Sequence, residues 1–228
     1  MACCPKSIIE DVLKKHDKIT HVYFVACGGS YAGLHPGKYF LQSEAKKVTV
    51  DHYTANEFCH ATPKALGPNS IVITQSHSGT TPETVKAAEI AQKAGAASVV
   101  ITFDDQSPLA KNGDYVLKYE AKATTDMTGM AFGLKLAVEI LNQIEGYENY
   151  DEMMNGFDRI DGIVKHAKEF LTPRAKVFAE EYKDEKDKSK IRAVSYWPAA
   201  HGRGQDSALQ LPVCQEERRR FHPPHRRH

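Results

Sequence analysis

The chain has 228 residues, of which 41% are hydrophobic and 26% are charged, and its formal net charge is +1. This balance gives no overall field that would recruit nucleic acid or an anionic membrane surface. No apolar run approaches the roughly 20 residues that span a bilayer, and the first residues lack the layout of a secretory signal. Five cysteines without metal-ligand spacing fit a reducing compartment. We therefore expect a cytoplasmic protein that binds neither nucleic acid nor membrane.

Apolar runs alternate with helix-like stretches over the first two thirds of the chain. A surface helix is predicted at 6–18. The predicted strands are 21–26, 47–50, 70–75, 97–103 and 115–119, and the predicted helices that follow them are 31–42, 54–61, 82–94 and 127–144. Strands that alternate with helices of this length indicate βαβ units. The predicted fold class is therefore α/β, a doubly wound parallel sheet with flanking helices.

The helix at 82–94 has the clearest end signals in the chain. Thr81 stands at its N-cap, Pro82 at its first helical position, and Gly95 just past its end. The run at 70–75 before it is largely apolar, which is typical of a strand that is buried on both faces.

Beyond residue 146 the strand pattern stops. Two amphipathic helices are predicted at 151–171 and 174–185, separated by Thr172 and Pro173. From residue 191 the composition changes, because all 21 lysines lie at or before Lys190 and seven of the nine arginines lie at or after Arg192. This change predicts an irregular, degenerate or non-native tail at 191–228; the alternative is a basic arm that contacts a polyanion.

Two glycine-containing loops each follow a predicted strand and open a predicted helix. Backbone N–H groups at a helix N-terminus, together with hydroxyls, form a cradle for phosphate. In an open α/β sheet such loops lie beyond the carboxyl ends of the strands. The residues predicted from these loops to bind a phosphate monoester are Gly28, Gly29, Ser30, Ser76, Ser78 and Gly79, with Thr80 or Thr81 completing the cradle at the helix N-terminus. Ser30 is expected to cap its helix, and the alternative is that these serines do no more than cap turns.

Other phosphate-binding and catalytic motifs do not fit this sequence. It contains neither G-x-G-x-x-G nor G-x-x-x-x-G-K-[ST], so a dinucleotide or triphosphate site is not expected. Ser78 lacks the flanking glycine of a nucleophile elbow, since Ser76 stands in its place. His77 is not expected to act as a base for these serines, because neighbouring side chains on an extended turn point apart. The histidines show no ligand spacing, and no metal is predicted.

The two loops nevertheless resemble a known pair of signatures. Residues 26–31 (Ala-Cys-Gly-Gly-Ser-Tyr) and 76–84 (Ser-His-Ser-Gly-Thr-Thr-Pro-Glu-Thr) resemble those of the sugar isomerase (SIS) domain, which has a flavodoxin-like fold. More narrowly, residues 18–190 are similar to the fructosamine-6-phosphate deglycases, relatives of the isomerase half of glucosamine-6-phosphate synthase. The resemblance implies that the sugar phosphate is bound by Ser30, Ser76, Ser78 and Thr81, in a site shaped by Gly28, Gly29, His77 and Gly79.

The resemblance also implies a function and a division of the chain. A deglycase of this family converts a fructosamine 6-phosphate to glucose 6-phosphate and an amine. The alternatives are an aldose–ketose phosphosugar isomerase and a non-catalytic lobe that binds a sugar phosphate. The predicted segments are an N-terminal helix at 1–17, a SIS phosphosugar-binding domain at 18–146, a helical segment at 147–190 and the tail at 191–228.

Catalysis does not follow from the resemblance for this chain. The chemistry needs a positioned acid/base pair and no cofactor. The resemblance places that pair in a second SIS lobe that should begin near residue 191, where residues 196–201 read Tyr-Trp-Pro-Ala-Ala-His and lack the pattern. No catalytic residue is therefore assigned, and whether the chain is an enzyme stays open. A homodimer is expected, because SIS sites are usually completed across a dimer.

Overall fold

The computed structural model of the chain describes residues 4–119 and 125–181. The predicted tail at 191–228 and the helix end predicted at 182–185 lie outside these residues. The chain divides into two compact units, Met1–Val164 and Lys165–His228, and the fold that positions the candidate site belongs to the first. No helix within the described ranges is long and apolar enough to cross a membrane.

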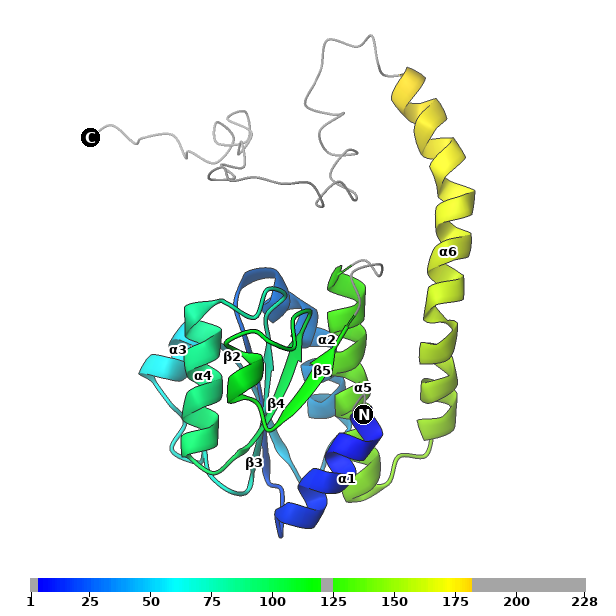
Figure 1. The fold of residues 1–228 in the computed structure, drawn as a ribbon. Helices are drawn as coiled ribbons and strands as arrows, with labels where there is room; N and C mark the ends of the chain where they lie inside the picture. The colour runs from blue at the N-terminus through cyan, green and yellow to red at the C-terminus, as the bar shows by residue number, and fades with distance from the viewer. Residues whose placement is uncertain (1–3, 120–124, 182–228) are drawn as a thin grey trace, which may run out of the picture. The chain divides into compact units, whose positions relative to one another are not determined.

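A sheet of five parallel strands forms the centre of the first unit (Figure 1). The strands are β1 (His21–Ala26), β2 (Thr49–Thr54), β3 (Ser70–Gln75), β4 (Ala97–Thr102) and β5 (Tyr115–Lys118), in the order β2-β1-β3-β4-β5. The register places Ala26 opposite both Thr54 and Gln75, so neighbouring strands end at a common edge. This order is that of flavodoxin-like proteins, and it confirms the predicted doubly wound parallel sheet.

The helices cover both faces of the sheet. They are α1 (Pro5–Lys15), α2 (Gly28–Glu44), α3 (Ala55–His60), α4 (Pro82–Lys93) and α5 (Thr125–Glu145), with a short 3-10 turn at Ala110–Asn112; α6 (Tyr150–Glu181) follows them in the chain. Helices α1, α2 and α5 pack together on one face, and α3 and α4 pack together on the other (Figure 1). Because both faces are covered, every residue of β3 is buried, as predicted.

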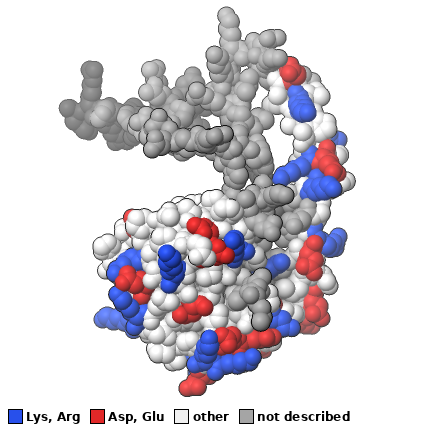
Figure 2. Space-filling view, in the orientation of Figure 1, with Lys and Arg blue, Asp and Glu red and all other residues white. Residues whose placement is uncertain are grey.

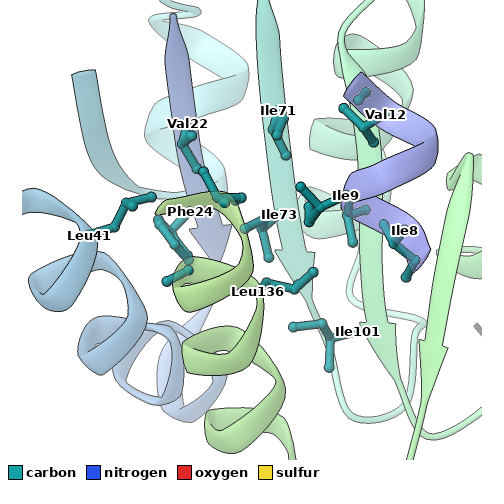
Figure 3. Packing of buried hydrophobic residues seen from close by; sticks show 14 of the residues in the cluster. Ile8, Ile9, Val12, Val22, Phe24, Leu41, Ile71, Ile73, Ile101 and Leu136 are labelled. Carbon is teal, nitrogen blue, oxygen red and sulfur yellow. The ribbon is translucent and has the colours of Figure 1, made fainter. Parts of the chain in front are cut away.

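The main core lies between the sheet and the layer of α1, α2 and α5. Leu136 of α5 lies against Ile73 and Ile101 of the sheet (Figure 3), and all three are fully buried. Burying a side chain of this size stabilises the fold by about 1.5–3 kcal/mol. Helices α2 and α5 approach closely at two glycines, since a Cβ added to Gly37 would lie 2.5 Å from the carbonyl oxygen of Gly133.

Among the strands, the second differs most from its predicted position. The strand predicted at 47–50 is Thr49–Thr54, which moves the start of α3 to Ala55. Pairing with β1 decides this register: the N–H of Thr49 donates to the carbonyl of Thr20 at 2.8 Å, and the ladder continues to Thr54. Local composition did not indicate a strand there, because residues 51 and 52 are Asp and His.

The prediction of two helices around Thr172 and Pro173 is wrong, since α6 runs without a break from Tyr150 to Glu181. Proline removes one backbone donor from a helix. This part of α6 is exposed, so water can bond the carbonyl that lacks its partner. The Thr172 hydroxyl also donates to the carbonyl of Lys168 at 2.6 Å, a bond within the helix.

The charged side chains show no patch of one sign on the face drawn in Figure 2, where acidic and basic residues are interspersed. Several of them are paired along helices, such as Lys15 with Asp11 at 2.7 Å. The described residues on this face therefore form no broad basic field for a polyanion.

Candidate functional site

The two predicted phosphate loops lie side by side at the carboxyl edge of the sheet. Strands β1 and β3 are neighbours, but β1 leads into α2 on one face while β3 leads into α4 on the other. This divergence makes the β1/β3 boundary the topological switch point, where doubly wound proteins bind ligands. The Thr84 hydroxyl of α4 and the Cys27 sulfur lie 3.8 Å apart and join the two loops.

The first loop forms the start of α2. The N-cap residue is Cys27, whose backbone is extended, and Gly28 is the first helical residue with a φ of +53°. The prediction that Ser30 caps the helix is wrong, because the glycines themselves enter the first turn and place Ser30 inside it. Within the described ranges, no side chain bonds the first-turn N–H groups of α2. Gly28 and Gly29 are exposed, and a Cβ on either would meet nothing within 4 Å.

The second loop is held in place by its backbone. Gly79 has a φ of +66°, and a Cβ there would overlap the side chain of Ser107 and lie 2.9 Å from Thr102 Oγ1. Its carbonyl accepts from the N–H of Leu109 at 3.0 Å, and the carbonyl of His77 accepts from Phe103 at 3.1 Å. Glycine is therefore required at position 79 both by the backbone conformation and by the close packing.

Two hydroxyl pairs lie within the second loop. Ser76 Oγ is 3.0 Å from Thr81 Oγ1, and Ser78 Oγ is 2.8 Å from Thr80 Oγ1. Thr81 is the N-cap of α4, as predicted, but its hydroxyl pairs with Ser76 and makes no capping bond. The free N–H groups in the first turn of α4 thus have no side-chain acceptor in the part of the chain that the structure describes, as in α2. An anion at this point would satisfy them.

The side chain of His77 lies against residues that follow β4 and β5. Its Nδ1 lies 2.8 Å from the hydroxyl of Tyr119, the rings stack with centroids 5.8 Å apart, and Phe103 lies on the same side at 5.4 Å. The imidazole therefore pairs with a residue that follows β5, which agrees with the expectation that it does not act on the adjacent serines. The sequence carried no signal for Tyr119, because only the strand order brings it near His77.

The groups that these loops offer to a ligand are neutral backbone N–H groups and hydroxyls. At the end of β5, Lys118 pairs with Asp105 at 3.1 Å, and this hydrogen bond lowers the pKa of the Asp105 carboxyl. The pair adds little net charge to the edge. Among residues 4–119 and 125–181, no three His, Cys, Asp or Glu side chains lie close enough to hold a metal ion.

Sequence reasoning also missed Gln75, the last residue of β3. Its side chain is 4% exposed, and Oε1 is buried without a hydrogen-bond partner. The only sequence signal was a polar residue at the end of a run otherwise expected to be buried.

The chain is a doubly wound α/β protein of the class that binds its ligand at the carboxyl edge of the sheet. This class is defined by the strand order, the switch point and the two helix N-termini that lack side-chain caps among the described residues. A family model described as the SIS domain matches residues 17–143, more than half of the chain. The chain therefore belongs to the SIS domain family.

Three known proteins illustrate the relationship. Fructosamine deglycase FrlB of Bacillus subtilis (strain 168) is 38% identical over 175 residues, which cover 75% of this chain and 53% of that protein. Fructoselysine 6-phosphate deglycase of Escherichia coli (strain K12) is 30% identical over 160 residues, 70% of this chain and 46% of that protein. A crystal structure from Salmonella typhimurium LT2 is provisionally described as a phosphosugar isomerase. It superposes on this chain with a TM-score of 0.73 at 44% identity, and the superposition covers 80% of this chain and 56% of the Salmonella chain. The chain thus spans about half the length of the curated relatives it matches.

Proposed function

We propose that the two loops bind the phosphate of a sugar phosphate or fructosamine 6-phosphate. The binding residues in this proposal are Gly28, Gly29, Ser30, Ser76, His77, Ser78, Gly79 and Thr81. The observation that carries it is the pair of neighbouring helix N-termini, α2 and α4, whose first-turn N–H groups have no side-chain acceptor. A phosphate at the switch point would accept from both helices and from the adjacent hydroxyls.

For a protein with the full length of these relatives, we propose a deglycase that releases glucose 6-phosphate and an amine from a fructosamine 6-phosphate. The support is the similarity to two deglycases, at 38% and 30% identity. Binding energy from the phosphate, which does not react, would hold the sugar carbons in position for proton transfer. The acid/base pair for that transfer is not assigned to any residue of this chain.

An aldose–ketose phosphosugar isomerase is the second candidate. It is favoured by the 44% identity to the Salmonella protein with that provisional description. Both reactions begin with proton transfer next to a carbonyl, and both would use the same phosphate cradle. A chain that binds the phosphate without turnover would act as a sugar-phosphate-binding lobe.

We also propose that the protein is a cytoplasmic homodimer. Apolar side chains on the later part of α6 support an interface, because Phe170, Leu171 and Val177 are 52%, 55% and 58% exposed. The metabolic roles named for the relatives support the location. Light scattering measures the oligomeric state, and a monodisperse monomer at micromolar concentration would contradict the dimer.

Thermal unfolding with and without fructose 6-phosphate tests the phosphate site. At a ligand concentration of 100 Kd, binding stabilises the native state by about 2.7 kcal/mol, which raises Tm by roughly 5–10 °C for a domain of this size. The double variant Ser76→Ala, Ser78→Ala should lose most of this rise, because two hydroxyls of the cradle are gone.

The matched control is Ser43→Ala, which removes a serine hydroxyl of α2 that donates to the carbonyl of Phe40 at 2.9 Å. It should keep the full ligand-dependent rise. An unchanged rise in the double variant would contradict the phosphate assignment. Release of glucose 6-phosphate from fructoselysine 6-phosphate would support the deglycase, and stabilisation without turnover would support the binding lobe.

A further inference from the structure

Gln75 is a buried polar residue at the edge where the two phosphate loops begin. Its side chain is 4% exposed, and Oε1 has no hydrogen-bond partner among the described residues. Leaving a buried carbonyl oxygen without a donor costs free energy, and native proteins rarely retain such a group without a reason. Leucine or methionine would fill a similar volume without this cost.

The side chain of Gln75 lies between α2 and α5. A Cβ added to Gly33 of α2 would lie 3.5 Å from its Nε2, and one added to Gly129 of α5 would lie 3.0 Å from its Cδ and still closer to Nε2. Two glycines on two different helices therefore leave the space that the amide occupies. A side chain at position 129 would displace it.

This position is next to both phosphate loops. Gln75 directly precedes Ser76 in the second loop, and its backbone is opposite Ala26, which leads into the first. Gly33 comes one helical turn after Ser30 on α2. The amide is therefore beside the proposed phosphate position, on the side of the sheet that α2 and α5 cover.

The chemistry of the unpartnered atom restricts what it can bind. Oε1 is an acceptor and needs a donor, and the dianionic phosphate group of a sugar phosphate has none to give. A hydroxyl donates one hydrogen bond and accepts others, so a single sugar hydroxyl can bond Oε1.

We propose that Gln75 is a further ligand-binding residue, whose side-chain amide bonds a hydroxyl of the sugar part of the ligand. This inference rests on the proposed phosphate site and adds to it a residue that recognises the polyhydroxylated part. A buried group that is satisfied only by the ligand's hydroxyl discriminates against phosphates that lack that hydroxyl.

Calorimetric titration of the Gln75→Leu variant with two probes tests this role. The affinity for fructose 6-phosphate should fall about tenfold, the loss expected for one buried hydrogen bond to a ligand hydroxyl. The affinity for inorganic phosphate should stay within about twofold of the parent value, because that probe offers the amide no sugar hydroxyl. The Tm of the free variant should equal or exceed that of the parent, since an unpaired buried acceptor has been removed.

Thr74→Val is the matched control. Thr74 is the preceding residue of β3, is fully buried, and also has a side-chain oxygen without a partner among the described residues. Its side chain faces the opposite side of the sheet. The valine variant should bind both probes as the parent does. Gln75→Met provides a second apolar variant of similar length if the leucine variant does not fold.

The outcomes separate this inference from the phosphate proposal. Equal losses for both probes, or no loss for either, in the folded Gln75 variants would overturn the role of Gln75. A double variant Ser76→Ala, Ser78→Ala that binds both probes unchanged would instead overturn the phosphate site. If the Gln75 variants lose affinity for fructose 6-phosphate but keep it for inorganic phosphate, and the serine double variant loses affinity for both probes, both proposals are supported.

Discussion

Substitution of Gly79 by alanine should destabilise the first unit through two separate effects. Gly79 has a φ of +66°, which an L-residue with a side chain adopts at a cost of about 1–2 kcal/mol. A Cβ there would also overlap the Ser107 side chain and lie 2.9 Å from Thr102 Oγ1. Ser107 cannot easily move away, because it is buried and its Oγ accepts from the N–H of Ala110 at 3.2 Å.

The two effects can be added to give an expected magnitude. Forced packing of this kind costs about 1–3 kcal/mol, so the whole change should cost about 3 kcal/mol. For a unit of this size that loss lowers Tm by roughly 6–12 °C. Gly28→Ala separates the effects, because Gly28 also has a positive φ, of +53°, but a Cβ there would meet nothing within 4 Å. It should cost only the conformational part, about 1 kcal/mol.

Urea denaturation followed by circular dichroism measures both variants without ligand. The expected result is a loss in the Gly79 variant that exceeds the loss in the Gly28 variant by about 2 kcal/mol. Equal losses would refute the reasoning, because they would mean that the contact with Ser107 imposes no constraint on the loop.

Two further predictions concern the other parts of the first unit. His52 of β2 is half-buried, and burial, followed by the charges of His35 and Lys38, lowers its pKa from 6.5 to about 4. The unfolded chain therefore takes up this proton first, and stability should decline as the pH falls from 6.5 to 4. The full pKa shift corresponds to about 3 kcal/mol, and solvent screening at a half-exposed site reduces this to about 1–2 kcal/mol. The free energy of unfolding of His52→Phe, measured from pH 6.5 to 4, should fall less steeply with pH than that of the parent protein. An unchanged slope would contradict the assignment. Gly37→Ala should cost about 3 kcal/mol in urea denaturation, since its Cβ would meet the backbone of α5, whereas Gly67→Ala, with nothing within 4 Å, should leave stability nearly unchanged.

The fold class could be predicted from the sequence because the decisive signals are local. Helix α4 has its N-cap, its first-turn proline and its terminal glycine within one short segment, and Gly95 adopts the positive φ of +74° that such an end requires. The alternation of apolar runs with such helices then indicated a parallel sheet, and the glycines located both loops at its carboxyl edge.

The remaining features depend on partners that are distant in the sequence. The register of β2 is set by its ladder with β1, and the pairing of His77 with Tyr119 is set by the strand order. Oε1 of Gln75 has no hydrogen-bond partner among the described residues, in a space that glycines of α2 and α5 leave open. Ser30 was predicted as the N-cap because serine favours that position. Helix α2 instead begins at Gly28, about one turn earlier, so Ser30 lies within its first turn.

The strand order has a consequence for how the domain is built during synthesis. Strand β1 can pair with β2, which follows it along the chain; β3 then pairs with the other edge of β1, β4 with β3, and β5 with β4. Each later strand pairs with the strand that was added before it at the same edge. No strand is therefore inserted between two strands that are already paired. The sheet is complete at Lys118, and α5 closes its second face by Glu145. Every strand and helix that holds the two loops together therefore lies at or before Glu145, so this lobe can fold as a unit during synthesis once Glu145 has emerged from the ribosome.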